Sequence, residues 1–392
     1  MEQLRVINVI YLDNAATSYP KPFEVIGAVN RAFSIYGANP GRSGHDLSVT
    51  SAMCVYSARE ELNELFGGFG SEFVSFTKNC TEALNIAIKG VIKKGGTILI
   101  SSLEHNSVAR PVYTLSQNGI ANMRIFDVGE NAKETVKNFK EALSLYKPEL
   151  CVVTAVSNVF GNILPLSLLS REAHKAGALF FVDGAQGAGV IELNMKKQGI
   201  DCLCVPGHKG LLGPMGTGAL LHNGCIENTV LEGGTGTSSF ELSQPKIFPE
   251  MLEAGTVNVP GIAGLRVGVK IVSAYGVKNI FEEESELVKQ LYDGLKNIDG
   301  VILYGDYTPE NFAPLLSFNI KNMHSETVSS KLNKNSIAVR GGFHCAPLAH
   351  NAMGTSALGA VRVSPSRFTS KKDINILLNV VNKICNPSTC ML

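Results

Sequence analysis

The sequence has no long apolar run and no cluster of charges of one sign. Its longest apolar runs, such as residues 150–156, have the length of a strand and are too short to span a bilayer. The first residues lack the apolar stretch and the cleavage site of a signal peptide. Lys and Arg number 35 against 34 Asp and Glu, so no surface for a polyanion is expected. We therefore expect neither a membrane nor a nucleic acid as partner.

The signs of a disulfide scaffold are also lacking, because the nine cysteines are an odd number at irregular spacings. This pattern indicates a reducing compartment, and we expect a cytoplasmic protein. The His and Cys spacings fit no zinc motif, so no metal site is predicted. The chain has 392 residues, 39 glycines and no tryptophan, which is typical of an α/β enzyme with many tight turns and two or three domains.

The first two thirds of the chain alternate short β-rich runs with helical stretches. Several of the β-rich runs are apolar throughout, as in strands that are covered on both faces of a parallel sheet. The alternation predicts a doubly wound α/β sheet. The expected strands are 97–102, 123–128, 150–156, 178–183, 202–205 and 218–222, and the expected helices are 80–94, 106–117, 132–145 and 168–176.

The character of the sequence changes after Gly255. We predict a large α/β domain over residues 13–260 and a smaller α+β domain over 261–392, joined by about residues 1–12. The smaller domain is expected to contain helices at 261–275, 281–295 and 372–384, and short strands near 315–320 and 338–340.

Polar residues follow several predicted strands, and in such sheets ligands bind at the carboxyl ends of the strands. Asp183 ends a buried apolar strand, where its charge needs a partner. A pyridinium nitrogen is one such partner, because the carboxylate keeps it protonated and improves the ring as an electron sink. Capping of the following turn is the alternative.

Lys209 lies in a glycine-rich turn after the next strand. A lysine in this position can reach inward and form an imine with an aldehyde cofactor, although most lysines are solvated surface residues. Thr81 follows a strand at the start of a helix, where a hydroxyl and free N–H groups bind phosphate or simply cap the helix. The order of Asp183 before Lys209 on adjacent strand ends is what a pyridoxal phosphate (PLP) site requires.

Together these residues resemble the class V PLP-dependent aminotransferases, and within them the cysteine desulfurases of the SufS/CsdA-like branch. The match covers nearly the whole chain. Its landmarks are Tyr11-Leu12-Asp13-Asn14-Ala15-Ala16, Ser101-Ser102-Leu103-Glu104-His105-Asn106, Ser157-Asn158-Val159-Phe160-Gly161, Asp183-Gly184-Ala185-Gln186, Gly207-His208-Lys209, Glu253-Ala254-Gly255-Thr256 and Arg340-Gly341-Gly342-Phe343-His344-Cys345-Ala346.

The resemblance implies the PLP-dependent transferase type I fold, with a mostly parallel central sheet, and a role for each landmark. PLP would be bound as an imine to Lys209, with His105 stacked on its ring and aiding proton transfer. Asp183 would pair with the ring nitrogen and Gln186 with the phenolic oxygen, while His208 and Thr81 would hold the phosphate. Thr256 would contact the phosphate of the neighbouring subunit's cofactor, which implies a homodimer. Asn158, Arg340 and Arg362 would bind the substrate.

Cys345 is expected to decide the reaction. A thiolate there can take the sulfur of L-cysteine and leave alanine, with a persulfide on the enzyme that passes to an acceptor protein in iron–sulfur cluster assembly. Thiolate character is needed, and we expect His344 and Arg340 to lower the pKa of this thiol. The alternative is that Cys345 is a small buried hydrophobe.

Other functions keep part of this set of residues. A selenocysteine lyase would use the same residues on L-selenocysteine, and a class V aminotransferase or another lyase would not need Cys345. A PLP-fold binding protein without activity is the alternative from outside the enzymes. One departure from the family is Cys80, which stands where a threonine is common.

Overall fold

The computed structural model describes residues 9–41, 44–237 and 239–386. A seven-stranded sheet forms the centre of the large domain, in the order β2-β8-β7-β6-β5-β3-β4. Neighbouring strands are parallel from β7 to β4, and β8 is antiparallel to β7 and β2. The strands are β2 Val74–Thr77, β3 Thr97–Ser101, β4 Asn122–Phe126, β5 Leu150–Thr154, β6 Leu179–Asp183, β7 Cys202–Pro206 and β8 Gly218–His222. The prediction of a mostly parallel α/β sheet is confirmed.

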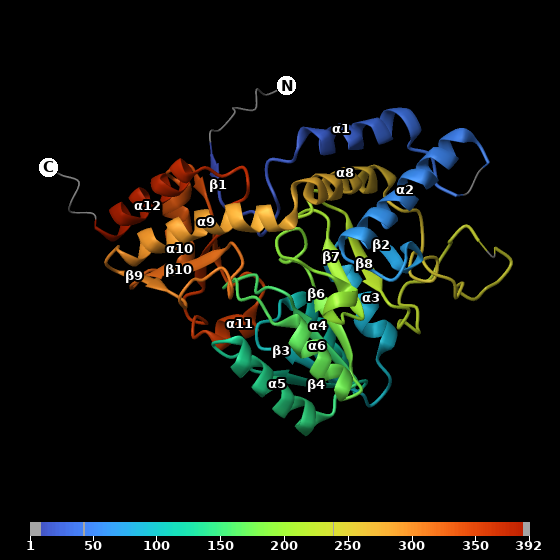
Figure 1. Ribbon diagram of the computed structural model, residues 1–392, viewed down its shortest axis with the longest axis horizontal. Coiled ribbons are helices and arrows are strands. Elements are labelled where there is room, and N and C mark those ends of the chain that lie inside the picture. The colour runs from blue at the N-terminus through green and yellow to red at the C-terminus, as the bar shows by residue number, and fades with distance from the viewer. Residues whose placement is uncertain (1–8, 42–43, 238, 387–392) are drawn as a thin grey trace.

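Helices cover both faces of this sheet (Figure 1). Strands β5, β7 and β8 are buried at every position, as the apolar runs predicted. Two apolar clusters, one on each face, make up the core of the domain. The helices of this part are α3 Cys80–Val91, α4 Asn106–Gln117, α5 Ala132–Tyr146, α6 Leu166–Lys175 and α7 Met195–Gln198.

Two N-terminal helices pack on α8, away from the centre of the sheet (Figure 1). They are α1 Phe23–Arg31, continued by the π-helical turn η1 Ala32–Tyr36, and α2 Asp46–Leu65, followed by the 3-10 turn η2 Ser71–Phe73. Helix α8, Val259–Tyr275, carries an Asn258 N-cap whose side chain accepts the N–H of Gly261. The predicted boundary between residues 260 and 261 falls near the start of this helix.

A four-stranded antiparallel sheet, in the order β12-β13-β10-β9, forms the smaller C-terminal part. A third apolar cluster lies between this sheet and helices α9, α10 and α12. The short strand β1 near the N-terminus pairs in parallel with β11 of this part, as was expected of the first dozen residues. Residues 1–8 of that expectation lie outside the described residues, and the domain boundaries stay a prediction. The elements are β1 Ile10–Tyr11, α9 Val277–Lys296, β9 Val301–Leu303, β10 Leu316–Ile320, α10 Ser325–Asn333, β11 Ile337–Ala338, β12 Arg340–Gly342, α11 Pro347–Ala352, β13 Ala360–Val363 and α12 Lys371–Cys385.

Candidate active site

A cavity of about 230 Å³ lies where β5, β6 and β7 end, between the large sheet and the smaller C-terminal part. Most of the residues singled out from the sequence line it, although they come from segments far apart in the chain. Those residues are Thr81, His105, Asn158, Asp183, Gln186, His208, Lys209, Arg340 and Arg362. Cys80, Ser107, Thr154 and His344 also line the cavity.

Asp183 ends β6 and is 1% exposed. Its Oδ1 accepts the backbone N–H of Ala185 at 2.9 Å and the thiol of Cys80 at 3.4 Å. Its Oδ2 accepts the hydroxyl of Ser107 at 3.4 Å. The backbone contact closes a turn directly after the strand, as the capping interpretation predicted. The two interpretations are compatible, because the carboxylate caps the turn and also borders the cavity.

Lys209 follows β7 and is mostly buried at the cavity wall. Burial, together with the smaller effect of the Arg362 cation, lowers the pKa of its amine to about 8, and Asp183 opposes both. The turn before it depends on Gly207, because a Cβ there would collide with the hydroxyl of Thr217. A buried amine with a lowered pKa is partly neutral near pH 8, and this is the form that attacks an aldehyde.

His105 caps α4, and its Nδ1 accepts the backbone N–H of Ser107 at 3.0 Å. Burial lowers the pKa of this imidazole, with Asp183 acting in the opposite direction. Because Nδ1 is an acceptor, the neutral ring carries its proton on Nε2. The turn after β3 therefore holds a neutral imidazole at the cavity.

Thr81 and His208 lie at the end of the cavity where α3 begins. Burial lowers the pKa of His208 to about 4, and the cations Lys209 and Lys21 add to this. Its buried Nδ1 has no hydrogen-bond partner among the described residues. A helix N-terminus, a hydroxyl and an unpartnered imidazole nitrogen fit a phosphate group at this end.

Arg362, on β13, is 1% exposed and projects from the opposite side of the cavity. One of its terminal nitrogens donates to Asp13 Oδ1 at 2.6 Å and the other to the carbonyl oxygen of Asn158 at 2.9 Å. The side chain of Asn158 in turn donates to the carbonyl oxygen of His344 at 2.8 Å. This network joins the N-terminal segment, the turn after β5 and the C-terminal sheet.

Cys345 is exposed and follows β12; it does not line the cavity itself, but the preceding residue His344 does. His344 and Cys345 both have left-handed backbone conformations, with φ of 50° and 56°. The carbonyl oxygen of Cys345 accepts the N–H of Asn106 at 2.7 Å, which ties the loop to the start of α4. Two consecutive non-glycine residues at positive φ are unfavourable and persist only where surrounding contacts impose them. The interpretation of Cys345 as a buried hydrophobe is wrong, because its side chain is exposed.

His344 does not carry the positive charge that was expected beside Cys345. Burial lowers the pKa of His344 to about 2, and Arg362 adds to this. The ring is therefore neutral at physiological pH and supplies no positive charge to a thiolate. Arg340, whose backbone carbonyl contacts His344 Nε2 at 3.2 Å, is the cation that remains in this segment.

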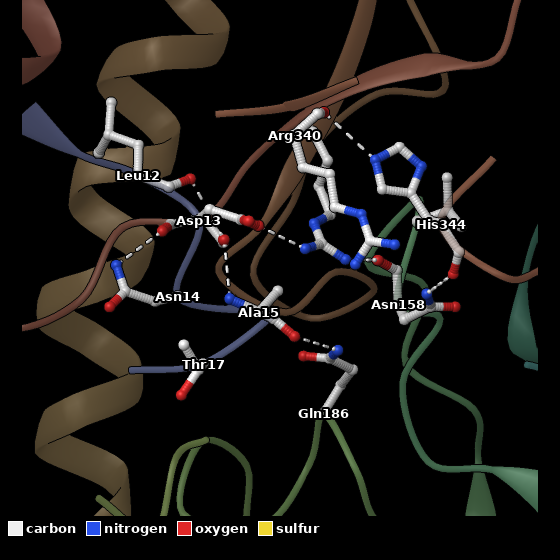
Figure 2. A network of polar contacts seen from close by, with 12 residues as sticks. Leu12, Asp13, Asn14, Ala15, Thr17, Asn158, Gln186, Arg340 and His344 are labelled. Atoms are coloured by element: carbon white, nitrogen blue, oxygen red, sulfur yellow. Dashed lines mark hydrogen bonds and ion pairs between the residues drawn. The ribbon is translucent and has the colours of Figure 1, made fainter. Parts of the chain in front are cut away.

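Thr256 does not line this cavity but borders two other hollows of the same chain, beside Glu253 and Gly255. Gln186 lines the cavity, and its amide donates to the carbonyl oxygen of Ala15 at 2.9 Å (Figure 2). The sequence reasoning gave no role to Ser107, Lys21 or the side chain of Asp13. Asp13 stood in a landmark motif, but only the fold shows its partner, because Arg362 is about 350 residues away.

The comparisons with known proteins agree with this geometry. The family model for "Aminotransferase class-V" matches residues 10–377. A protein of Methanothermobacter thermautotrophicus named "Probable cysteine desulfurase" is 33% identical over 384 residues, which cover 96% of this chain and 94% of that protein. The chain belongs to the cysteine desulfurases of this family.

Solved structures of cysteine desulfurases share the fold. The apo enzyme of Thermococcus onnurineus NA1 superposes with a TM-score of 0.89 and 31% identity, over 97% of this chain and 95% of that one. The desulfurase CsdA of Escherichia coli gives a TM-score of 0.84 and 26% identity, over 96% and 94% of the two chains. Like its family, this cysteine desulfurase depends on PLP.

The residues of the cavity fit that cofactor. Lys209 offers a partly neutral amine for its aldehyde, Asp183 a buried carboxylate for its ring nitrogen, and His208 an unpartnered nitrogen beside the start of α3. The described residues contain no group of three or more His, Cys, Asp or Glu that could hold a metal ion. None of the helices in the described ranges is long and apolar enough to cross a membrane.

Proposed function

We propose that this cysteine desulfurase takes the sulfur of L-cysteine onto Cys345, with Lys209 holding PLP. The overall change is L-cysteine plus the Cys345 thiol giving L-alanine plus a persulfide on Cys345, which balances in atoms and electrons. The C–S bond of the substrate breaks, and an S–S bond forms at Cys345 Sγ. The observation that carries the proposal is the exposed Cys345 directly after His344, which lines the same cavity as Asp183 and Lys209.

PLP supplies an electron sink when it is bound. The chain's own groups supply the rest. Lys209 Nζ, whose pKa burial lowers to about 8, can accept the α-proton of the substrate, and the neutral His105 lies at the same cavity. Arg362 and Asn158 hold the substrate carboxylate, and a guanidinium suits this group because its donors match the two oxygens. Arg340 provides a second cation on the same wall.

A direct test is to incubate the PLP-loaded protein with L-cysteine and a thiol reductant and to assay both sulfide and alanine. We expect wild type to form both products, and Lys209→Ala and Cys345→Ala to form neither. Lys133→Ala on the exposed face of α5 and Cys385→Ala at the end of α12 are the matched controls and should keep wild-type rates. If Cys345→Ala forms sulfide as fast as wild type, Cys345 is not the acceptor. L-selenocysteine assayed in parallel measures the preference between the two substrates.

The persulfide is expected to pass to an acceptor protein in the cytoplasm, in the service of iron–sulfur cluster assembly. A persulfide on an exposed side chain is accessible to such an acceptor. Mixing the cysteine-treated enzyme with a candidate scaffold or shuttle protein, and following the mass of each by spectrometry, tests the transfer. Loss of the extra sulfur from the enzyme without its gain by the candidate would rule that candidate out.

A homodimer with shared sites is part of the proposal. Thr256 does not line the cavity of its own chain, and large apolar side chains are exposed on α1 and α2, among them Phe23, Ile26 and Met53. Exposed apolar clusters of this kind mark protein interfaces. We expect sedimentation of a dimer, and weaker retention of PLP in Thr256→Ala. A monomer that retains PLP fully would exclude the shared site.

A further inference from the structure

The N-terminal segment from Asp13 to Lys21 crosses between the two walls of the cavity. At one end, the backbone N–H of Ala15 donates to Ser364 Oγ at 2.9 Å, directly after β13. At the other end, Ser18 Oγ donates to the carbonyl oxygen of Lys209 at 3.0 Å. This segment therefore contacts both the strand that carries Arg362 and the turn that carries the cofactor lysine.

Asp13 is the residue of this segment that forms an ion pair with Arg362. The pair is short, 2.6 Å, and the side chains of Arg362 and Asp13 are 1% and 21% exposed. The carbonyl oxygen of Asn158 accepts from the other terminal nitrogen of the guanidinium at 2.9 Å. Two acceptors thus fix the plane of the group, while its buried Nε–H has no partner among the described residues.

Burial and the neighbouring cation Arg340 both disfavour the positive charge of Arg362. Burial lowers the pKa of Arg362, Asp13 raises it, and the neighbouring Arg340 lowers it. A buried charge that loses its only counter-ion is strongly unfavourable, and its side chain tends to move towards water. Without Asp13, Arg340 and Arg362, which are paired on the neighbouring strands β12 and β13, would repel each other with no carboxylate beside them until a substrate supplied one.

We propose that Asp13 is a positioning residue that holds Arg362 in the orientation that receives the substrate carboxylate. It acts through Arg362 and does not touch the reacting atoms. Because only one Asp13 oxygen is engaged with Arg362, the guanidinium keeps its Nε–H edge for an incoming carboxylate. The inference rests on the proposed role of Arg362 in substrate binding.

The experiment compares two ligands that differ only in the carboxylate. L-Alanine and ethylamine are titrated into the PLP-loaded protein, and binding is followed by the absorbance of the cofactor. We expect Asp13→Ala to weaken L-alanine binding roughly 10- to 100-fold, the value of one charged hydrogen bond, and to change ethylamine binding by less than about twofold. Asp13→Asn keeps an acceptor oxygen and should restore part of the affinity. Asp293→Asn, which makes the same change at an exposed ion pair on α9, should match wild type.

Three outcomes would overturn the proposal. Equal weakening of both ligands would mean that Asp13 only maintains the structure. Unchanged or tighter L-alanine binding would mean that Asp13 competes with the substrate for Arg362. If wild type itself does not favour L-alanine over ethylamine, the carboxylate role of Arg362 fails, which is distinct from a failure at Asp13 alone. Melting of the apo variants identifies a folding defect, and Asp13→Asn then carries the test.

Discussion

The two walls of the active-site cavity are built differently. The cofactor wall, made of Thr81, His105, Asp183, His208 and Lys209, lies at the ends of four strands of one sheet, β2, β3, β6 and β7. The substrate wall, made of Asn158, Arg340, His344, Arg362 and Asp13, is assembled from four separate segments. On the cofactor wall, part of the support is local, since Asp183 accepts from the N–H two residues later.

On the substrate wall, the charge of Arg362 has no hydrogen-bond acceptor from residues near it in the sequence among those that the structure describes. Arg362 receives its counter-ion from residue 13 and its second acceptor from residue 158. At the carboxyl ends of the strands, backbone N–H groups a few residues away can therefore stabilise a charged side chain. A buried arginine on the small antiparallel sheet instead needs hydrogen-bond partners from distant segments of the chain. The difference implies that the cofactor wall forms with the large sheet, and the substrate wall only when the N-terminal segment is docked.

The largest expected effect is on the cofactor wall. Asp183→Asn removes the negative charge that we propose for the cofactor ring nitrogen but keeps the shape of the side chain. We expect kcat for alanine formation to fall roughly 100- to 1,000-fold, as when one preorganised electrostatic group is lost, while PLP stays bound through Lys209. Asp127→Asn, an exposed change of the same kind, is the control. A loss of less than about fivefold would contradict the role of Asp183.

A smaller effect is expected on the substrate wall. Arg362→Lys keeps the charge but cannot contact Asp13 and the carbonyl oxygen of Asn158 with two separate nitrogens. We expect KM for L-cysteine to rise roughly 10- to 100-fold, with a smaller change in kcat. Steady-state kinetics measure both constants. If kcat falls and KM stays the same, Arg362 acts on the reacting atoms, and the division between the walls would have to be redrawn.

The smallest effect concerns two buried acids, one in each part of the molecule. Burial raises the pKa of Glu104 to about 8, although hydrogen bonds from Ser101 and Thr154 oppose it. Burial likewise raises the pKa of Glu284 on α9 to about 8, opposed by the N–H of Arg367. Both acids stay protonated in the folded protein while the unfolded chain ionises above its ordinary pKa of 4.5. Their contribution to stability is therefore lost progressively as the pH rises from about 4.5 to 8.

Glutamine removes this titration and keeps an acceptor oxygen. We expect the melting temperature of Glu104→Gln and of Glu284→Gln to fall less than that of wild type between pH 5 and pH 8, by a few degrees. Differential scanning calorimetry across this range measures the slopes. The exposed Glu282→Gln on α9 should keep the wild-type slope. A steeper fall in either variant at the buried positions would show that the acid is ionised in the folded state.

Much of the large domain could be predicted from the sequence. The strand over residues 218–222 and the helix over 106–117 have the predicted bounds, because apolar runs and the His105 cap are local signals. Helices α1 and α2 were missed, since large apolar residues such as Phe23 and Met53 are exposed, while the buried stripe of α2 includes polar residues such as Ser51. The neutral state of His344 was missed because burial by distant segments, not its neighbours in sequence, lowers its pKa.

The sequence by itself determined the strand ends that carry Asp183 and Lys209, since periodicity and short motifs mark where buried strands stop and polar turns begin. It also determined the family, through the order of its motifs. Only the tertiary structure decided the partner of Arg362, the strained backbone of Cys345 and the separation of Thr256 from its own cavity. The physical reason is that a buried charge takes whichever counter-ion the packed chain brings within reach, and sequence distance does not limit that choice.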